Sequence, residues 1–288
     1  MSSPSAENDQ WDINIKSTRG LLEIDIAEIW RYRDLLVMFI VKDIVTRYKQ
    51  TILGPLWFML QPIFTAVVYT LIFSRVAKIP TNGAPPILFY LGSLTLWSYF
   101  SETFGIISKT FSENAAVLGK VYFPRLVLPL AKAISGIIKM FMQFAIFFVV
   151  LGYHMTVTHM ASPNWYALSL PFLLLLLAAF SMGAGLMVTS LTSKYRDLNF
   201  LIVFGIQLYM YVTPVIYPLS ITSPKKQFIL WLNPLTSIFE AFKYSFLGEN
   251  SGIWSNYWLG YTTLFTIVMF MIGLIMFNRV EKKFIDTI

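Results

Sequence analysis

The sequence predicts an all-α membrane protein, and three observations support this fold class. Charged residues make up 13% of the 288 residues, about half of the roughly 25% that is usual in soluble domains. Hydrophobic residues make up 56% and aromatic residues 17%, which is more apolar surface than a water-soluble globule of this size would bury. Several long stretches contain no Asp, Glu, Lys or Arg. These observations together exclude a soluble enzyme.

The charge-free stretches locate the spans, because a transmembrane helix needs about 20 consecutive apolar residues. Four of these stretches fit one span each, and a fifth, Met140 to Ser193, is long enough for two. Its middle, GYHMTVTHMASPNWY (152–166), is polar and turn-rich and is the expected loop between those two spans. The sequence therefore predicts six spans, at about 54–75, 87–107, 132–151, 167–190, 199–219 and 257–277.

The distribution of basic residues predicts the orientation. Six spans place both termini on one side of the membrane, and that side has about three times as many Lys and Arg residues as the other. Because cytoplasmic loops are the ones enriched in Lys and Arg, both termini are predicted to be cytosolic. Residues 1–27 are polar and lack the apolar region of a signal peptide, so we expect a polar cytosolic segment there. The net charge of +7 then reflects loops beside an anionic leaflet rather than binding of nucleic acid.

The segment 28–51, before the first span, is predicted to be an amphipathic interface helix. Apolar residues such as Leu35, Leu36 and Phe39 alternate there with basic residues. The basic residues are Arg31, Arg33, Lys42, Arg47 and Lys49. Such a helix lies in the headgroup plane with its apolar face toward the lipid. A simple membrane anchor is the alternative interpretation.

The loop between the second and third spans is predicted to contain a short docking helix. Ser112-Glu113-Asn114 can cap a helix that runs to Leu118, and Phe123-Pro124 would end it, since the residue before proline avoids the helical region. The loop is rather apolar for a solvated segment, which favours contact with a partner over an ordinary connection. The shorter loop SKYRDL (193–198) supports the same interpretation less strongly.

The segment 223–248, between the fifth and sixth spans, is predicted to form two short apolar helices that meet at Asn233-Pro234. Neither helix is long enough to cross the membrane, so we expect them to be re-entrant or interfacial at the outer face. Helices in this position can act as a lid over an exit.

The sequence contains no motif for catalysis or for metal binding. It lacks GxxxxGK[ST], HExxH, GxSxG and any cysteine. His154 and His159 are interpreted as loop residues rather than metal ligands, because no carboxylate is near them in the sequence. Glu102 and Lys139 lie at similar depth inside their spans, so two interpretations remain open: a buried ion pair, or two side chains that reach separately toward the headgroups.

Aromatic residues are abundant in the spans and also allow two interpretations. The candidates for a channel lining are Trp57, Phe64, Tyr69, Trp97, Tyr209, Tyr211 and Tyr217. Tyr and Trp are enriched at the membrane interfaces of any membrane protein. The other interpretation is an aromatic pore, which suits sugars because their C–H faces pack on rings while hydroxyl groups meet the Tyr O–H.

Several motifs resemble one protein family. The run RYRDLLVMFIVKDIVTRYKQTILGPLWFMLQP (31–62) is similar to the amino-terminal signature of the permease subunits of ABC exporters for bacterial O-antigens, capsules and teichoic acids, a type-2 permease class. Further similar stretches are NAAVLGKVYFPRLVLPL (114–130), SKYRDL, TPVIYPLS (213–220), LNPLTSIFEAFKYSFLG (232–248) and the tail EKKFIDTI. They follow the family's order from about residue 28 to the end and most resemble the O-antigen (lipopolysaccharide) export type.

This resemblance implies a function for the whole chain. It implies a permease subunit, not an enzyme, with residues 52–288 as the transmembrane domain. The resemblance also implies that a second copy of the chain and two copies of a separate ABC ATPase subunit complete the exporter. ATP and Mg²⁺ would be bound by that ATPase, with no cofactor in this chain. The implied substrate is a polyprenyl-diphosphate-linked polysaccharide, exported from the cytosol across the bacterial plasma membrane, the inner membrane in a Gram-negative cell.

Other functions remain as alternatives. An exporter for capsule, teichoic acid, a smaller lipid or a drug would share this architecture. A membrane glycosyltransferase would need a cluster of carboxylates, and a channel or secondary transporter would need no ATPase.

The resemblance also implies roles for particular residues. ATPase coupling would involve Asn114, Leu118, Lys120, Tyr122, Phe123, Pro124, Arg125, Tyr195, Arg196 and Asp197. The interface or gate helix, where the lipid headgroup would enter, would use Arg31, Arg33, Arg47, Tyr48 and Lys49. The outer gate would involve Asn233, Pro234 and Glu240.

Overall fold

The structure is a computed structural model that describes residues 26–49, 52, 54, 56–118, 123–158, 161, 163–193, 195 and 197–285. The predicted polar segment 1–27 lies almost wholly outside these residues. The longer helices are α2 (Arg33–Tyr48), α3 (Leu56–Tyr69), α4 (Pro86–Ile107), α6 (Val127–Tyr153), α7 (Leu170–Thr192), α8 (Leu198–Val212), α10 (Pro234–Leu247) and α11 (Asn256–Ile285). The shorter ones are α1 (Ile26–Arg31), η1 (Thr70–Val76), α5 (Thr110–Leu118), η2 (His154–Thr158), η3 (Trp165–Ser169), η4 (Leu219–Ile221) and α9 (Pro224–Trp231). The described part of the chain contains no strand, as the predicted all-α class requires.

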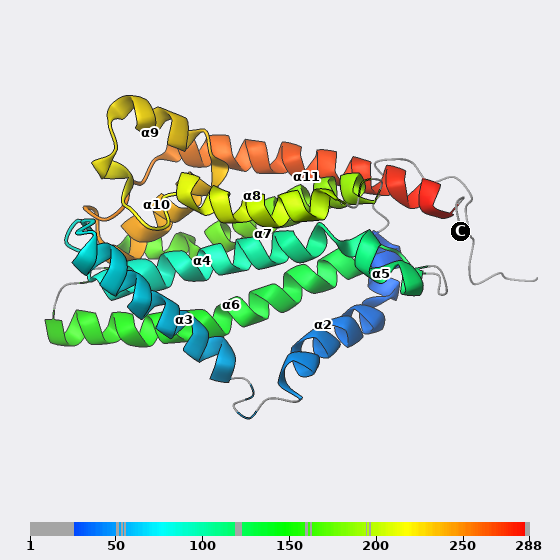
Figure 1. The fold of residues 1–288 in the computed structure, drawn as a ribbon, viewed down its shortest axis with the longest axis horizontal. Coiled ribbons are helices and arrows are strands. Elements are labelled where there is room, and N and C mark those ends of the chain that lie inside the picture. Colours follow the sequence, from blue (N-terminus) through cyan, green and yellow to red (C-terminus); the bar gives the residue numbers. More distant parts are fainter. Residues whose placement is uncertain are drawn as a thin grey trace, which may run out of the picture.

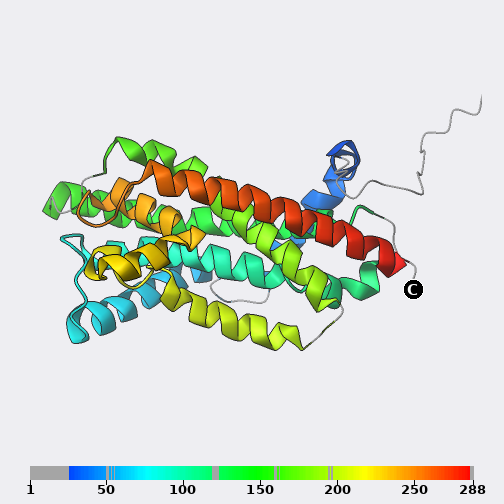
Figure 2. The ribbon, with the colours of Figure 1, turned by 90° about the horizontal axis from the view of Figure 1, so that it is seen from above.

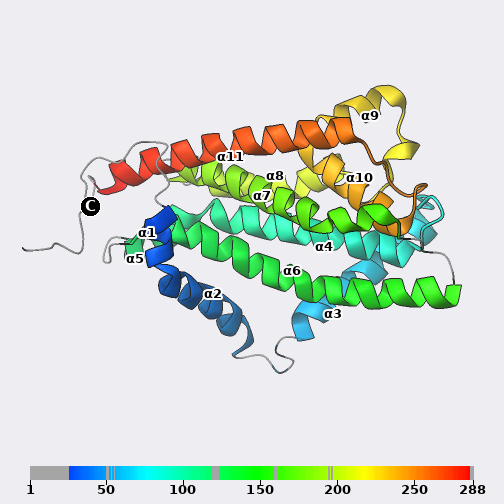
Figure 3. The same ribbon diagram turned by 180° about the vertical axis from the view of Figure 1, so that it is seen from behind.

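The helices form an elongated bundle in which α4, α6, α7, α8 and α11 follow the long axis (Figure 1). One end carries α1, α5 and the carboxyl-terminal part of α11, and we call it the α5 end. The opposite end carries α9 and α10, and we call it the α9 end (Figures 1 and 3). Helices α2 and α3 lie along one side of the bundle, while Figure 2 shows α8 at its edge.

Among the described residues, four continuous helical segments are long and apolar enough to cross a membrane. They are Leu56–Val76, Val127–Thr158, Trp165–Thr192 and Asn256–Val280. Helix α4 has 22 residues but includes Ser93, Thr95 and Glu102, and α8 is an apolar helix of only 15 residues. These features make the chain a multi-pass membrane protein.

Two glycines allow α7 and α11 to pack closely at the centre of the bundle. A Cβ atom added to Gly183 would lie 2.7 Å from the Cα atom of Phe270, and one added to Gly273 would lie 2.3 Å from the carbonyl oxygen of Gly183. Small residues let two helix backbones approach in this way, which is the usual packing device of helices in a bilayer.

Buried apolar residues form two separate cores. The core toward the α9 end surrounds α4 and includes Phe89, Tyr90, Phe147, Phe239 and Phe242. The core at the α5 end, which we call the α5-end core, includes Ile107, Phe111, Phe123, Met182 and Phe277, with Leu35, Leu36 and Phe39 of α2 packed against it. The predicted interface helix is therefore part of the folded bundle along its amino-terminal half.

The structure corrects the predicted fifth span. The prediction extended it from 199 to 219, but α8 ends at Val212. Thr213 has an extended backbone (φ −94°, ψ 138°), because Pro214 follows it and disfavours the helical region for the preceding residue. The next four residues, from Thr213 to Ile216, are buried as irregular chain.

Other predicted boundaries are also corrected. The predicted loop 152–166 is partly helical, since α6 continues through η2 to Thr158. The predicted interface helix 28–51 is two helices, α1 and α2, which are separated at Tyr32 (φ −93°, ψ 20°). The docking helix α5 begins at Thr110, before the predicted cap at Ser112, and the backbone of Asn114 is non-helical.

The two helices predicted for residues 223–248 are present as α9 and α10, which meet at Asn233-Pro234. Nearly every residue of α10 is buried, so this helix lies inside the protein rather than on its surface. Its aromatic side chains Phe239 and Phe242 pack into the core toward the α9 end.

Candidate functional site

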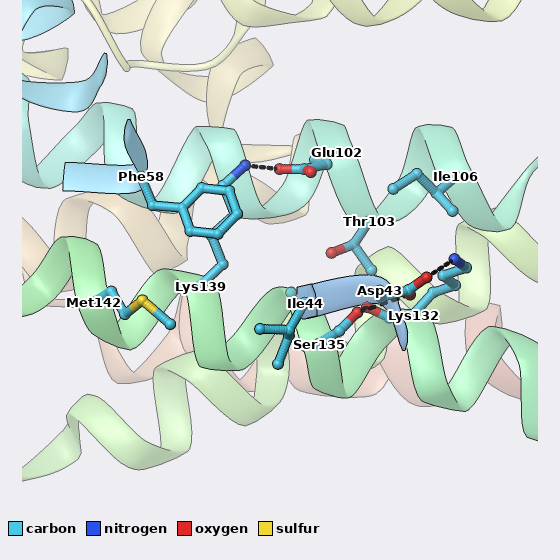
Figure 4. Close-up of a pocket in the computed structure, with 11 residues that line it drawn as sticks. Asp43, Ile44, Phe58, Glu102, Thr103, Ile106, Lys132, Ser135, Lys139 and Met142 are labelled. Carbon is cyan, nitrogen blue, oxygen red and sulfur yellow. Dashed lines mark hydrogen bonds and ion pairs between the residues drawn. The ribbon is translucent and has the colours of Figure 1, made fainter. Parts of the chain in front are cut away.

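A polar pocket lies between α2, α3, α4 and α6 (Figure 4). We call it the α2 pocket. Its lining consists of Asp43, Ile44, Phe58, Glu102, Thr103, Ile106, Lys132, Ser135, Gly136, Lys139 and Met142. It brings together two lysines and two carboxylates in a chain with few charges.

The first charge pair of the α2 pocket joins two long helices. Lys139 of α6 donates to the Oε2 atom of Glu102 on α4. The Lys139 ammonium also lies 5.0 Å from the ring centroid of Phe58 on α3, within the range of a cation–π contact. Pairing, one of the two interpretations left open by the sequence, is the arrangement found.

The second charge pair joins α2 to the bundle. Lys132 of α6 donates to the Oδ1 atom of Asp43, and the Ser135 hydroxyl donates to its Oδ2 atom at 3.3 Å. Sequence reasoning missed this pair, because Asp43 lies among cations in a helix interpreted as basic. The spacing on α6 was the available signal, since residues 132, 135 and 139 lie on one helix face.

The predicted gate residues whose side chains are described do not line this pocket. Arg31, Arg33 and Lys49 are exposed, and the side chains of Arg47 and Tyr48 lie outside the described residues. The Arg33 guanidinium lies 5.8 Å from the Trp30 ring centroid, and its Nε atom lies 3.8 Å from an oxygen of Asp34. Arg33 is thus partnered within the amino-terminal part of the interface segment.

The predicted coupling residues divide into buried and exposed groups. Phe123, Pro124 and Arg125 are buried, and the Phe123 ring lies 6.0 Å from the ring of Phe39 on α2. Asn114 is half-buried, whereas Tyr195 and Asp197 are exposed. Lys120, Tyr122, Arg196 and the side chain of Leu118 lie outside the described residues. The contact between Phe123 and Phe39 connects the loop that follows α5 to the interface segment.

The predicted channel aromatics do not form one continuous line. Trp97 and Tyr209 belong to one cluster, with ring centroids 6.1 Å apart, and both contact Phe100. That cluster borders an apolar groove of about 400 Å³ whose lining includes Phe100, Phe104, Phe180, Ile206 and Tyr209.

The other predicted channel aromatics lie elsewhere. Trp57 and Phe64 are exposed on α3, and Tyr211 is exposed on α8. The Tyr69 hydroxyl contacts the sulfur of Met210 at 3.9 Å, and the Tyr217 hydroxyl donates to the Tyr211 carbonyl at 3.1 Å. Tyr69 therefore connects α3 to α8 across the bundle.

Asn233 of the predicted outer gate is a junction between α8 and α10. Its Oδ1 atom accepts hydrogen bonds from the Tyr209 hydroxyl at 2.5 Å and from the Leu235 backbone N–H at 3.0 Å, which caps α10. Its Nδ2 atom donates to the Thr213 hydroxyl at 2.9 Å. The cap residue that starts α10 thus also holds the end of α8.

Glu240 of the predicted outer gate forms a completely buried ion pair with Lys243. Lys243 also donates to the Pro214 carbonyl at 3.1 Å, and its ammonium lies 5.0 Å from the Phe89 ring centroid. Glu240 accepts backbone hydrogen bonds from Leu219 and Ile253. Sequence reasoning did not find this pair, in which the lysine faces a carboxylate one turn away on its own helix.

These arrangements suit binding and movement rather than covalent chemistry. Each charge described in the α2 pocket has an opposite partner, and the groove beside Tyr209 is lined by apolar side chains. Paired charges between helices can exchange partners when the helices move or when a charged ligand enters.

Comparisons with known proteins agree with this picture. Residues 35–247 match the family described as "ABC-2 type transporter". The chain is 26% identical over 253 residues to the O-antigen export system permease protein RfbA of Klebsiella pneumoniae, covering 88% of this chain and 94% of that protein. It is 27% identical over 220 residues to the O-antigen export system permease protein RfbA of Myxococcus xanthus, covering 76% and 82% of the two chains.

Proposed function

The chain belongs to the ABC-2 type transporter family, and from this premise we propose that it is the transmembrane permease subunit of an ATP-driven exporter of polyprenyl-diphosphate-linked polysaccharide. One observation carries the proposal: both relatives described above are named O-antigen export permeases and match this chain over most of their length. Their names give O-antigen as what they export, and we assign a substrate of the same class to this chain.

The proposed topology has six spans with both termini in the cytosol. The four candidate spans are completed by α4 and α8. With 15 residues, α8 is about 22 Å long, shorter than a hydrocarbon core of about 30 Å. The buried irregular segment after it and the helices α9 and α10 complete the crossing, because non-helical backbone is tolerated at membrane depth where protein covers it. The α5 end is then cytosolic and the α9 end faces outward.

The proposed exporter contains two copies of this chain and two copies of a separate ABC ATPase subunit. ATP and Mg²⁺ would bind to the ATPase, since this chain has no nucleotide motif. Tyr195 and Asp197 are exposed at the α5 end, where we place the docking surface for the ATPase. The exposed apolar face of α8, which includes Phe200, Leu201 and Phe204, is where the second copy would close the path of the glycan.

The packing suggests how movement of the ATPase would reach the gate. Binding of ATP would bring the ATPase subunits together and shift α5. Helix α5 contributes Phe111 to the α5-end core, and Leu36 and Phe39 of α2 pack against the same core. A shift of α5 would therefore reach α2 through this shared core, and the glycan would pass the aromatic side chains near Tyr209.

A pull-down of the tagged chain from native membranes tests this proposal. We expect a stoichiometric ABC ATPase to co-purify, and deletion of this chain to leave surface polysaccharide undelivered and accumulated on its lipid carrier inside the cell. Absence of an ATPase under conditions that preserve other membrane complexes would contradict the proposal and favour a channel or secondary transporter. Unchanged surface polysaccharide in the deletion strain would remove the polysaccharide as substrate.

A further inference from the structure

The two halves of α2 are attached to the bundle by different means. The amino-terminal half packs Leu35, Leu36 and Phe39 against the α5-end core. The carboxyl-terminal half contributes no described residue to that core, and Val41 and Val45 are exposed. Its polar attachment to α6 is the Asp43 carboxylate, held by Lys132 and Ser135.

The attachment at Asp43 is open to exchange. The Asp43 and Lys132 side chains retain 18% and 26% of their accessible surface, and both line the α2 pocket. A lysine ammonium has three N–H donors, and Ser135 of α6 and Thr103 of α4 add hydroxyl groups to the lining of the pocket. An anion with several oxygens can therefore replace the single carboxylate on Lys132 (Figure 4).

The depth of Lys132 suits a lipid headgroup. Lys132 lies five residues after the start of α6 at Val127, near the α5 end. In the proposed topology this is the level of the cytosolic headgroups. Lys132 of α6, which faces α2, thus presents a cation to phosphates at the surface of the membrane.

We propose that Lys132 exchanges Asp43 for the diphosphate of the lipid-linked substrate, and that this exchange releases the carboxyl-terminal half of α2 from the bundle. The inference rests on the proposed function for the identity of the ligand, a phosphate ester on a membrane lipid. The Asp43–Lys132 ion pair holds the carboxyl-terminal half of α2 until a ligand displaces Asp43, and we call this pair the lock. The apolar contacts around Phe39 stay in place and act as the pivot.

The second lysine of the pocket serves a different role. Lys139 is paired with Glu102 between two long helices, its ammonium contacts the Phe58 ring, and it lies two helical turns deeper along α6. Its side chain is less exposed than that of Lys132, at 16% against 26%. The Glu102–Lys139 pair therefore holds α4 to α6 and provides a matched control.

Binding of undecaprenyl diphosphate to the purified chain in phosphatidylcholine nanodiscs tests the exchange. Because Asp43 competes with the ligand, D43N should bind this lipid more tightly, while K132M should bind it about tenfold more weakly, the loss expected for one charge-assisted contact. K132R, which keeps the charge, should bind like the wild type. Two control ligands are used: undecaprenol, which has the isoprenoid tail without phosphate, and inorganic pyrophosphate, which has the phosphates without a tail. Both should bind far more weakly than undecaprenyl diphosphate.

Opposite effects of D43N and K132M are required, because a merely structural ion pair would weaken binding in both variants. The proposal would be overturned if D43N and K132M both bound undecaprenyl diphosphate more weakly than the wild type. It would also be overturned if E102Q bound this lipid more tightly and K139M more weakly, by the same factors as D43N and K132M. Pyrophosphate that binds as tightly as the lipid would also overturn it, since the ligand would then be a free anion.

Release of α2 is measured by cysteine labelling, which the cysteine-free chain allows without background. Ile44 is half-buried and lines the α2 pocket, and Val45 beside it is exposed; both belong to the carboxyl-terminal half of α2. Undecaprenyl diphosphate should speed the reaction of I44C with a water-soluble maleimide, as should D43N without ligand, while V45C should react at one rate throughout. An I44C rate that does not change in D43N would show that the pair is not a lock.

Failure of this inference and failure of the proposed function are distinguishable. If the lock does not respond to the lipid but the ATPase co-purifies and polysaccharide is exported, only the exchange at Lys132 is wrong. If the chain neither binds an ATPase nor exports polysaccharide, the identity of the ligand fails together with the function.

Discussion

The ion pairs at the two ends of the bundle differ in their surroundings. Glu240 and Lys243 lie one turn apart on α10 at the α9 end and retain 1% and 0% of their side-chain surface. Asp43 and Lys132 come from different helices near the α5 end and keep about a fifth of theirs. The first pair has further partners in Pro214, Leu219 and Ile253.

This difference separates a permanent contact from an exchangeable one. A buried pair whose remaining oxygens and protons are all bonded cannot be opened without leaving an uncompensated charge. A partly exposed pair loses little when water or a ligand replaces one partner. The α9 end is therefore built as a fixed closure around α10, and the α2 pocket is built to change partners.

Breaking the buried pair should have the largest effect. E240A leaves the Lys243 ammonium buried without its carboxylate, which is expected to cost about 3–5 kcal/mol of the free energy of unfolding. Unfolding of the purified protein in mixed detergent measures this. The double variant E240L/K243M should cost less than E240A, because it removes both charges. A cost for E240A no larger than that for D43A would contradict the comparison.

The close approach at Gly252 should have the next largest effect. A Cβ atom there would lie 2.4 Å from both the Glu240 carbonyl oxygen and the Tyr244 backbone nitrogen. G252A must displace backbone, so we expect a loss of about 1–3 kcal/mol in the same unfolding assay. Gly260, where no atom lies within 4 Å, is the control, and G260A in the interior of α11 should be neutral or slightly stabilising. Equal effects of the two substitutions would refute the tight packing of α10.

The Glu102–Lys139 pair should show a smaller effect than the buried pair. E102Q removes the carboxylate charge but leaves Lys139 partly exposed and beside the Phe58 ring. We expect a loss of about 1 kcal/mol, the upper range for an exposed pair. A loss as large as that of E240A would show that the α2 pocket is as rigid as the α9 end.

An exposed residue at the α5 end should leave stability unchanged. Asp197 precedes α8 and makes no side-chain cap hydrogen bond, so D197A should unfold at the same denaturant concentration as the wild type. Co-purification of the ATPase should nevertheless decrease, because Asp197 lies on the proposed docking surface. K225A, an exposed charge at the α9 end, should leave both quantities unchanged. Normal recovery of the ATPase with D197A would remove this residue from the docking surface.

The sequence by itself determined the class of the protein and most of its helices. A scarcity of charge predicts membrane spans, and Asn233-Pro234 predicts the junction between α9 and α10, because a proline ring suits the first turn of a helix. The predicted end of the helix in the fifth span was wrong, because apolar composition continues past Val212 while Pro214 ends the helix. Coupling and gate residues inferred from the resemblance remain predictions, and three of them, Phe123, Pro124 and Arg125, are buried.

Only the tertiary structure decided which charges meet. Asp43 and Lys132 are 89 positions apart, and Glu102 and Lys139 are 37 apart. Composition and helical periodicity show on which face of its own helix a residue lies, but not which helix packs against that face. That choice depends on how all the apolar surfaces are buried together. The same packing buried Lys243 beside Glu240 and placed Asp43 in the partly exposed lining of the α2 pocket.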